Sequence, residues 1–325
     1  MNNNDSKYKQ IVNHVVDGII EGSLKKGDWI PSINDFRRDY HMSRDTVFAG
    51  LSELKSKGII DSKPGVGYYV TSARIPQKLN ICVLFNEFNE FKEDLYNSFI
   101  AEIGSKANVD IYFHNYNRKM FNTLLEGANG KYTTYVVMSG KFTGTAPLLR
   151  SLSGDVYLLD HFHQELLGKY PAVYQNFEKD TKEALVYGLV HLRKYNHIVM
   201  VKGDEKEPIE RYYGLREFCD ENGFSHEYIP NVKDREIKKG EVYMVVNDRD
   251  LVSLIKLVGK EGLVLGEDLG IISYNDTPLK EILAGGITTL STDFVLMGKT
   301  MAKLIRGKEN ATIENPWRLN IRKSL

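Results

Sequence analysis

Cysteine, net charge and long apolar runs are all scarce in this chain of 325 residues. Its two cysteines, Cys82 and Cys219, form no Cys-x-x-Cys motif, which excludes a disulfide scaffold, a zinc knuckle and a redox pair. No 18 consecutive residues are apolar, and the first ten contain no cleavable apolar segment. We therefore expect a cytoplasmic protein that is neither secreted nor bound to a membrane.

Neither positively nor negatively charged residues are in excess. The chain holds 43 Lys and Arg residues against 43 Asp and Glu residues, and residues 1–72 hold ten basic and nine acidic ones. This balance excludes a strongly cationic surface that coats nucleic acid. Any DNA binding must therefore depend on individual contacts placed on one face.

The first seventy residues begin with two predicted helices. Apolar residues at spacings of three and four indicate an amphipathic helix over about residues 6–21. Ser32 is followed three positions later by Asp35, which is a capping pattern and predicts a second short helix that ends near Tyr40.

A third helix and a hairpin follow. Ser43 is placed to cap the third helix, and Gly58 to end it. The second and third helices, joined by about three residues, form a helix-turn-helix. Residues 59–70 then alternate around Pro64-Gly65, as a two-stranded hairpin does. The segment therefore predicts a winged helix.

The order of residues in this segment resembles a known family. The matching positions are Tyr8, Ile11, Gly22, Leu24, Gly27, Asp28, Ile30, Pro31, Ser32, Ser43, Arg44, Thr46, Val47, Leu51, Leu54, Gly58, Gly65, Gly67, Tyr69 and Val70. Together they resemble the DNA-binding domain of the gluconate-repressor (GntR) family over residues 6–72. The resemblance implies a homodimer on a near-palindromic, double-stranded operator, with the third helix in the major groove and the wing at the minor groove. Asn34 departs from the pattern, because many members carry a DNA-contacting arginine there.

Candidate DNA contacts follow from this placement. Arg44 is expected to read bases, since a guanidinium can bond both acceptors of a guanine. Asp45 would accept from cytosine or only favour the helix start, and basic side chains would hold phosphates or lie solvated. Glycines in the wing let its backbone approach the duplex. The full set is Ser32, Arg37, Arg38, Ser43, Arg44, Asp45, Thr46, Lys63, Gly65 and Gly67.

Residues 71–78 are polar and contain a proline, so they predict a short linker. We expect a DNA-binding domain over 1–72, a linker over 73–78, and an effector-binding and dimerisation domain over 79–325. A linker this short should transmit changes in the larger domain to the DNA-binding domain.

From Leu79 onward, short apolar runs alternate with amphipathic stretches, which is typical of an α/β fold with parallel sheets. Ten parallel strands in one sheet are unusual, so we expect two sheets. Strands are predicted at 79–85, 109–114, 133–138, 155–159, 172–175, 197–201, 226–229, 241–246, 269–273 and 287–290. Helices are predicted at 91–107, 118–128, 144–152, 178–194, 207–222, 248–261 and 294–306.

This region also carries a recognisable order of motifs. They are Asn176, His191-Leu192, Arg211 to Gly214, Asn247-Asp248, Gly266 to Asp276, Thr288 to Leu290, Asp293-Phe294, Met297-Gly298 and Trp317 to Arg322. The series resembles the effector domain of lactose/galactose-repressor (LacI/GalR) proteins, which is similar to periplasmic sugar-binding proteins. The resemblance implies two α/β lobes, roughly 79–175 with 292–307 and 176–290 with the tail, and a ligand between them.

Four residues match positions that bind sugar in that family: Arg211, Asn247, Asn275 and Phe294. Planar hydrogen-bonding groups suit sugar hydroxyls, and an aromatic ring suits the apolar C–H face. Other interpretations remain open, namely a surface ion pair for Arg211, a turn at Asn275 and core packing for Phe294. Asn275 departs from the commoner aspartate. Further candidates after strand ends are Asn86, Phe91, Asp160 and His161.

The sequence contains no complete motif of the common enzyme and metal-binding classes. Neither a Gly-x-Ser-x-Gly elbow nor a Gly-x-Gly-x-x-Gly turn after the first strand occurs. Asp293 occupies the position where a phosphate-binding loop ending at Lys299-Thr300 needs its first glycine, and His161-x-His163 lacks further ligands. Glu205 and Glu207 are expected to be solvated. We expect no catalytic residue, metal or cofactor.

The sequence thus predicts a sugar-responsive transcription regulator, most simply a repressor of a sugar-utilisation operon. Similar two-part regulators suggest a pentose or a 6-deoxyhexose such as arabinose or fucose as effector, and a phosphorylated sugar stays open. The alternatives are an α/β enzyme that acts on a small sugar and carries an appended DNA-binding domain, and lobes that only dimerise or bind proteins.

Overall fold

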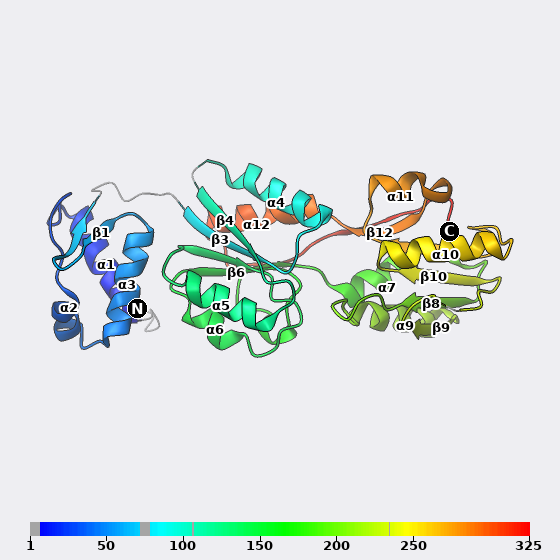
Figure 1. Cartoon of the computed structure of the whole chain (residues 1–325), viewed down its shortest axis with the longest axis horizontal. Coiled ribbons are helices and arrows are strands. Elements are labelled where there is room, and N and C mark those ends of the chain that lie inside the picture. Colours follow the sequence, from blue (N-terminus) through cyan, green and yellow to red (C-terminus); the bar gives the residue numbers. More distant parts are fainter. Residues whose placement is uncertain (1–6, 72–78, 106, 234) are drawn as a thin grey trace. The chain divides into compact units, whose positions relative to one another are not determined.

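The computed structural model describes residues 7–71, 79–105, 107–233 and 235–325. The predicted linker over 73–78 lies outside the described residues, so the boundary between the DNA-binding domain and the rest stays a prediction. The chain divides into two units, Met1–Ala172 with Gly298–Thr312, and Val173–Met297 with Ile313–Leu325. We call the α/β part of the first unit, with the strands that complete its sheet, lobe one, and the rest of the second unit lobe two (Figure 1).

The winged helix forms as predicted. Its elements are α1 (Lys7–Ile20), α2 (Ile33–Tyr40), α3 (Arg44–Ser56), and the antiparallel strands β1 (Ile60–Lys63) and β2 (Gly67–Val70). Ser32 and Asp35 form a reciprocal capping box at the start of α2, because each side chain accepts a hydrogen bond from the other's backbone amide. Buried apolar residues from all three helices and the hairpin, including Ile11, Phe36 and Leu51, form one core.

Lobe one is built around a six-stranded sheet in the order β13-β7-β6-β5-β3-β4. Its strands are β3 (Leu79–Phe85), β4 (Ala107–Phe113), β5 (Thr134–Val137), β6 (Asp155–Asp160), β7 (Ala172–Tyr174) and β13 (Thr312–Glu314). Its helices are α4 (Glu90–Ile103), α5 (Arg118–Ala128), α6 (Ala146–Ser151), η1 (Gln164–Leu166) and most of α12 (Phe294–Gly307). Helices α4 and α12 lie on one side of the sheet, and α5 and α6 on the other (Figure 1).

Lobe two holds a second six-stranded sheet in the order β14-β12-β11-β10-β8-β9. Its strands are β8 (His197–Val201), β9 (Ser225–Ile229), β10 (Glu241–Val245), β11 (Gly270–Tyr274), β12 (Thr288–Thr292) and β14 (Trp317–Asn320). They are parallel except for β14, which pairs antiparallel with β12. The helices are α7 (Phe177–Tyr187), α8 (Leu189–Leu192), α9 (Glu210–Asn222), α10 (Asp248–Lys260), α11 (Pro278–Ile282) and η2 (Leu283–Gly285).

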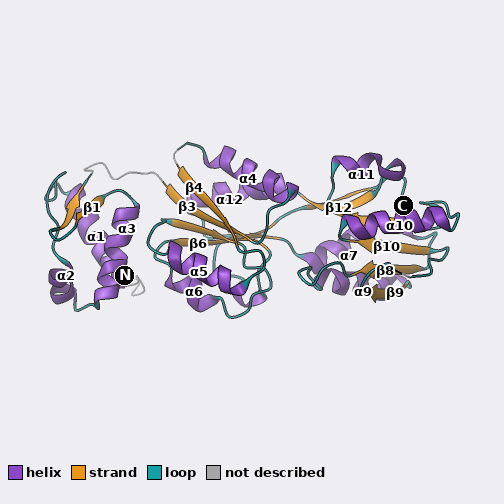
Figure 2. Ribbon diagram, in the orientation of Figure 1, coloured by secondary structure: helices purple, strands orange, loops and turns teal. Residues whose placement is uncertain are grey.

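Successive side chains along the strands of lobe two face opposite sides of the sheet, and both sides are apolar, so both must be covered by helices. Val199 and Tyr243 pack with residues of α10 on one face, and their neighbours Ile198 and Val242 pack with residues of α7 and α9 on the other. A parallel sheet whose two faces are both apolar must be covered twice. The two helix layers are visible in Figure 2.

The two-sheet α/β architecture is confirmed, and each predicted strand has its counterpart. Sequence analysis missed β13, β14 and α11, which have three, four and five residues, because such short segments show too little periodicity. The single helix predicted at 178–194 is wrong. It is two helices, α7 and α8, which meet at Gly188.

Gly214 on α9 sets how closely this helix approaches α7. A Cβ atom built at position 214 would lie 2.0 Å from the backbone oxygen of Glu178. We therefore expect Gly214→Ala to lower the free energy of unfolding by about 1–3 kcal/mol, measured by urea denaturation. As a matched control, Gly259→Ala on α10 meets nothing within 4 Å and should stabilise by about 0.4–1 kcal/mol. Equal stability of the two variants would contradict this packing.

Candidate DNA-binding and effector sites

The first turn of α3 presents polar side chains to solvent. The Ser43 hydroxyl accepts a hydrogen bond from the Thr46 amide at 3.2 Å and lies 2.8 Å from the Thr46 hydroxyl. Arg44 and Asp45 are exposed, whereas Val47 faces the core. Ser43 and Thr46 therefore fix the helix start, and Arg44 and Asp45 remain placed for contacts outside the domain.

The two arginines of α2 differ in their surroundings. Arg38 forms ion pairs with Asp35 at 3.1 Å and Asp39 at 2.9 Å. Its hydrogen bond to Asp39 raises the pKa of the guanidinium further, and the Ser32 hydroxyl lowers the pKa of Asp35. The predicted contact of Arg38 with a DNA phosphate therefore requires it to leave these carboxylates. Arg37 is exposed on the same helix.

The turn of the wing contains two positions whose backbone conformation favours glycine. The Val66 amide donates to the Lys63 carbonyl at 3.0 Å and closes the turn. Gly65 has φ +75° and Gly67 has φ +150°, conformations that side-chain-bearing residues rarely adopt. Lys63 at the end of β1 is exposed. The predicted wing residues therefore occupy one tight, accessible turn.

In lobe two, Arg211 is the best-organised of the predicted effector residues. Only 7% of it is exposed. Its guanidinium lies between two rings, 4.6 Å from the centroid of Phe177 and 4.5 Å from that of Tyr274. It also forms an ion pair with Glu207, which lies four residues earlier in the loop before α9. The expectation that Glu207 is solvated is therefore wrong, and the i, i+4 spacing of the pair was the signal that would have found it.

Asn247 and Asn275 follow the neighbouring strands β10 and β11. Asn247 caps α10, because its side-chain oxygen accepts from the Asp250 amide at 2.8 Å and its amide donates to the Asp250 carboxylate at 2.8 Å. Asn275 has φ +59°, a left-handed conformation that asparagine tolerates. The carboxyl ends of adjacent parallel strands share one edge of a sheet, so both amides lie at the ligand-binding edge of this fold class.

A buried lysine that sequence analysis missed holds the loop of Asn275. Lys280 is 3% exposed and donates to the carbonyl oxygens of Tyr274 and Asn275, each at 2.9 Å. It also pairs with Asp248 at 3.2 Å. Phe294 at the start of α12 is 8% exposed, so packing accounts for most of its surface.

The predicted residues of lobe one cluster at the carboxyl edge of its sheet. Asn86 follows β3 and donates to the Tyr116 hydroxyl at 2.8 Å. Asp160 ends β6 and forms a buried ion pair with Lys92 of α4. Sequence analysis missed Lys92, although it directly follows the predicted Phe91. Phe91 and His161 are half-buried beside them. The individual roles of these residues stay predictions.

Asp180, in the first turn of α7, is 6% exposed, and its Oδ1 atom has no hydrogen-bond partner in the structure. Burial and the negative charge of Glu314 raise the pKa of Asp180 to about 7. Because the unfolded chain loses this proton near its ordinary pKa, the folded state holds an extra proton between about pH 4 and 7. The free energy of unfolding should therefore fall as pH rises through this window, by up to about 1.4 kcal/mol per pH unit.

Asp180→Asn removes this titration. We expect the variant to lose the wild-type decrease in thermal midpoint between pH 4 and 7, and to be more stable than wild type above pH 7. Midpoints measured across this pH range test the prediction. A variant whose pH profile matches that of wild type would show that Asp180 is not the group responsible.

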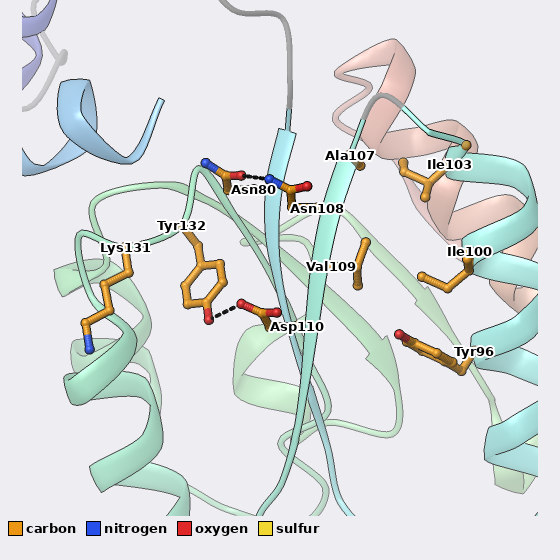
Figure 3. A pocket seen from close by; sticks show the side chains of 11 residues that line it. Asn80, Tyr96, Ile100, Ile103, Ala107, Asn108, Val109, Asp110, Lys131 and Tyr132 are labelled. Carbon is orange, nitrogen blue, oxygen red and sulfur yellow. Dashed lines mark hydrogen bonds between the residues drawn. The ribbon is translucent and has the colours of Figure 1, made fainter. Parts of the chain in front are cut away.

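A depression of 750 Å³ lies elsewhere on lobe one, between α4 and the edge strand β4 (Figure 3). Among its lining residues, Tyr132 donates to Asp110 at 2.7 Å, and Asn108 donates to Asn80 at 3.0 Å. Asn80 and Asn108 lie near the amino ends of β3 and β4. This depression therefore lies at the amino ends of the strands, whereas the predicted effector residues follow the carboxyl ends, and none of those residues lines it.

Neither a membrane-spanning helix nor a cluster of metal ligands occurs in the described part of the chain. None of the described helices is long and apolar enough to cross a membrane. Within the same residues, no group of three or more His, Cys, Asp or Glu side chains is arranged to hold a metal ion.

Comparison with known proteins agrees with both halves of the structure. Residues 7–70 match the family of bacterial regulatory proteins called gntR, and residues 189–325 match a periplasmic binding protein-like domain. The arabinose metabolism transcriptional repressor of Halalkalibacterium halodurans is 22% identical, over 93% of this chain and 88% of its own length.

Solved structures share the fold over about three quarters of this chain. A LacI family transcriptional regulator from Silicibacter pomeroyi is 15% identical and superimposes with a TM-score of 0.64, over 76% of this chain and 98% of that one. A periplasmic binding protein/LacI regulator from Alkaliphilus metalliredigens, solved with D-xylulofuranose, is 14% identical with a TM-score of 0.58, over 75% and 98%. The chain thus joins a helix-turn-helix domain that matches the gntR family model to a domain that matches the periplasmic binding protein-like model and shares the fold of LacI family regulators.

Proposed function

We propose that this protein is a cytoplasmic repressor of sugar-utilisation genes, which binds operator DNA as a homodimer and responds to a monosaccharide. The observation that carries the proposal is the union of a gntR-type winged helix and a periplasmic-binding-protein-like domain in one chain. The arabinose metabolism repressor that aligns along most of the chain supports the sugar response. The relatives are regulators rather than enzymes, which speaks against the alternative of a sugar-processing enzyme.

The charges around the candidate effector residues of each lobe, taken separately, favour an uncharged effector. Three Lys or Arg residues are buried among the described residues, and each already has a carboxylate: Arg211 pairs with Glu207, Lys92 with Asp160, and Lys280 with Asp248. A phosphate group is balanced most directly by a buried cation without such a partner, and none of these three offers one. A neutral sugar needs only donors and acceptors, such as the amides of Asn86, Asn247 and Asn275.

Within this class we favour a pentose or a 6-deoxyhexose such as arabinose or fucose. One structural relative was solved with D-xylulofuranose, a pentose, and another relative is an arabinose metabolism repressor. Effector binding alters DNA affinity only if the sugar binds one conformation better than the other. A typical coupling of about 1–3 kcal/mol corresponds to a change of roughly 5- to 150-fold in operator affinity.

A monosaccharide panel tests the proposal. We expect one neutral pentose or 6-deoxyhexose to raise the thermal midpoint of the full chain and to lower operator affinity within this range. The 1- or 5-phosphate of the same sugar should give no shift. The absence of any shift across the panel would overturn the sugar response, and turnover of the sugar would favour the enzyme alternative. A thermal shift with the sugar phosphate but not with the free sugar would overturn only the proposal that the effector is uncharged.

A further inference from the structure

Phe48 is an apolar side chain left in solvent on the DNA-reading helix. It lies in the second turn of α3 and is 55% exposed, whereas Phe36 in the same domain is 1% exposed. The other large exposed aromatic of the domain, Trp29, is 51% exposed but packs its ring against Tyr69 at 5.5 Å between centroids. The exposed part of Phe48 therefore contributes nothing to the packing of the winged helix.

The position of Phe48 places it beside the predicted base reader. Residues four apart share one face of a helix, so Phe48 stands one turn after Arg44 and three positions after Asp45. All three are exposed, while Val47 and Leu51 fill the inner face of α3. A recognition helix reads bases with residues of its first turns. With α3 in the major groove, as the proposed function requires, Phe48 would face the base pairs next to those that Arg44 contacts.

We propose that Phe48 reads a thymine, by packing its ring against the 5-methyl group in the major groove. The methyl is the one apolar feature that the major-groove edge of a base pair presents, and a phenylalanine ring is a suitable partner for it. Removing a large apolar surface from water on binding supplies affinity without a hydrogen bond. Each half-site would then carry a thymine at a fixed step from the base pair that Arg44 contacts.

Deoxyuridine differs from thymidine only in lacking this methyl, so it provides the test. The full-length protein first selects its preferred duplex from a randomised pool, and each thymine of that duplex is then replaced singly by deoxyuridine. We expect one position per half-site at which the replacement weakens wild-type binding by about three- to tenfold. Phe48→Ala should bind the thymine and uracil duplexes equally at that position, and Phe48→Leu should keep part of the preference.

Two comparisons separate this contact from other effects. Val66→Ala removes an equally exposed apolar side chain, 60% exposed at the tip of the wing, and should leave the thymine preference in the α3 contact region unchanged. The thermal midpoint of Phe48→Ala should equal that of wild type, since the ring packs little within the domain. The proposal is overturned if Phe48→Ala keeps the wild-type preference for thymine, or if it loses stability rather than methyl recognition. Failure to enrich any duplex would remove DNA binding and this proposal together.

Discussion

Replacing Arg44 by alanine is expected to weaken binding to the selected operator by about 5- to 150-fold, with no loss of stability. The side chain is exposed at the first position of α3, so its removal leaves no cavity and no buried partner. A guanidinium bonded to both acceptors of a guanine contributes about 1–3 kcal/mol of discrimination against other bases. Fluorescence anisotropy at a fixed salt concentration measures the loss, because salt alone changes such affinities greatly.

Two further variants show whether Arg44 reads sequence or only attracts phosphate. Arg44→Lys keeps the charge but not the planar fork, so the preference for guanine at its position should relax while non-specific binding persists. Arg37→Ala should weaken binding to all duplexes about equally and reduce the dependence of log affinity on log salt by about one counterion. If Arg44→Ala and Arg37→Ala gave the same uniform loss, Arg44 would be a phosphate contact instead.

Local patterns in the sequence were sufficient to predict most of the fold. The capping box of Ser32 and Asp35 involves residues three apart, and the cap of α3 by Ser43 is equally local. Strands β3 and β8 show as continuous apolar runs at 81–85 and 198–201, because helices cover both sides of their sheets. Both kinds of signal are complete within a few residues, so they require no knowledge of the tertiary structure.

The surroundings of the candidate effector residues were not predictable in this way. Phe177 and Tyr274, which enclose Arg211, lie 34 and 63 positions from it, and Lys92 pairs with Asp160 across 68 positions. Such partners are fixed by the order of strands in each sheet, which a single sequence does not reveal. Sequence analysis therefore identified the polar residues at the strand ends but not the groups that balance their charge.

The carboxyl-terminal residues illustrate the same limit. Arg322, just after β14, binds Asp276 through two hydrogen bonds of 2.6 and 2.8 Å. Asp276 follows Asn275, so the end of the chain fixes a candidate ligand-binding loop 46 residues earlier. Sequence analysis recognised both segments as family motifs, but the antiparallel pairing of β14 with β12 is what brings them together.

Replacing Arg211 by alanine is expected to abolish the thermal shift by the effector and to destabilise lobe two. Truncation leaves a gap between the rings of Phe177 and Tyr274 and leaves the Glu207 carboxylate, which is 21% exposed, without its cation. Breaking a buried pair in this way costs about 3–5 kcal/mol of folding free energy. Effector affinity should fall by about 30-fold or more, since truncating one partner of a buried charged contact costs at least about 2 kcal/mol.

A double variant separates loss of folding from loss of binding. Arg211→Met with Glu207→Gln fills the space between the rings and removes the unpaired carboxylate, so most of the stability should return. Effector binding should not return, because a thioether cannot donate hydrogen bonds to sugar hydroxyls. Arg193→Ala, which removes an arginine stacked on Phe224 at 6.0 Å, serves as the control and should keep effector affinity. If the double variant binds the effector as tightly as wild type, Arg211 acts only by supporting the two rings, and the amides of Asn247 and Asn275 must recognise the sugar without it.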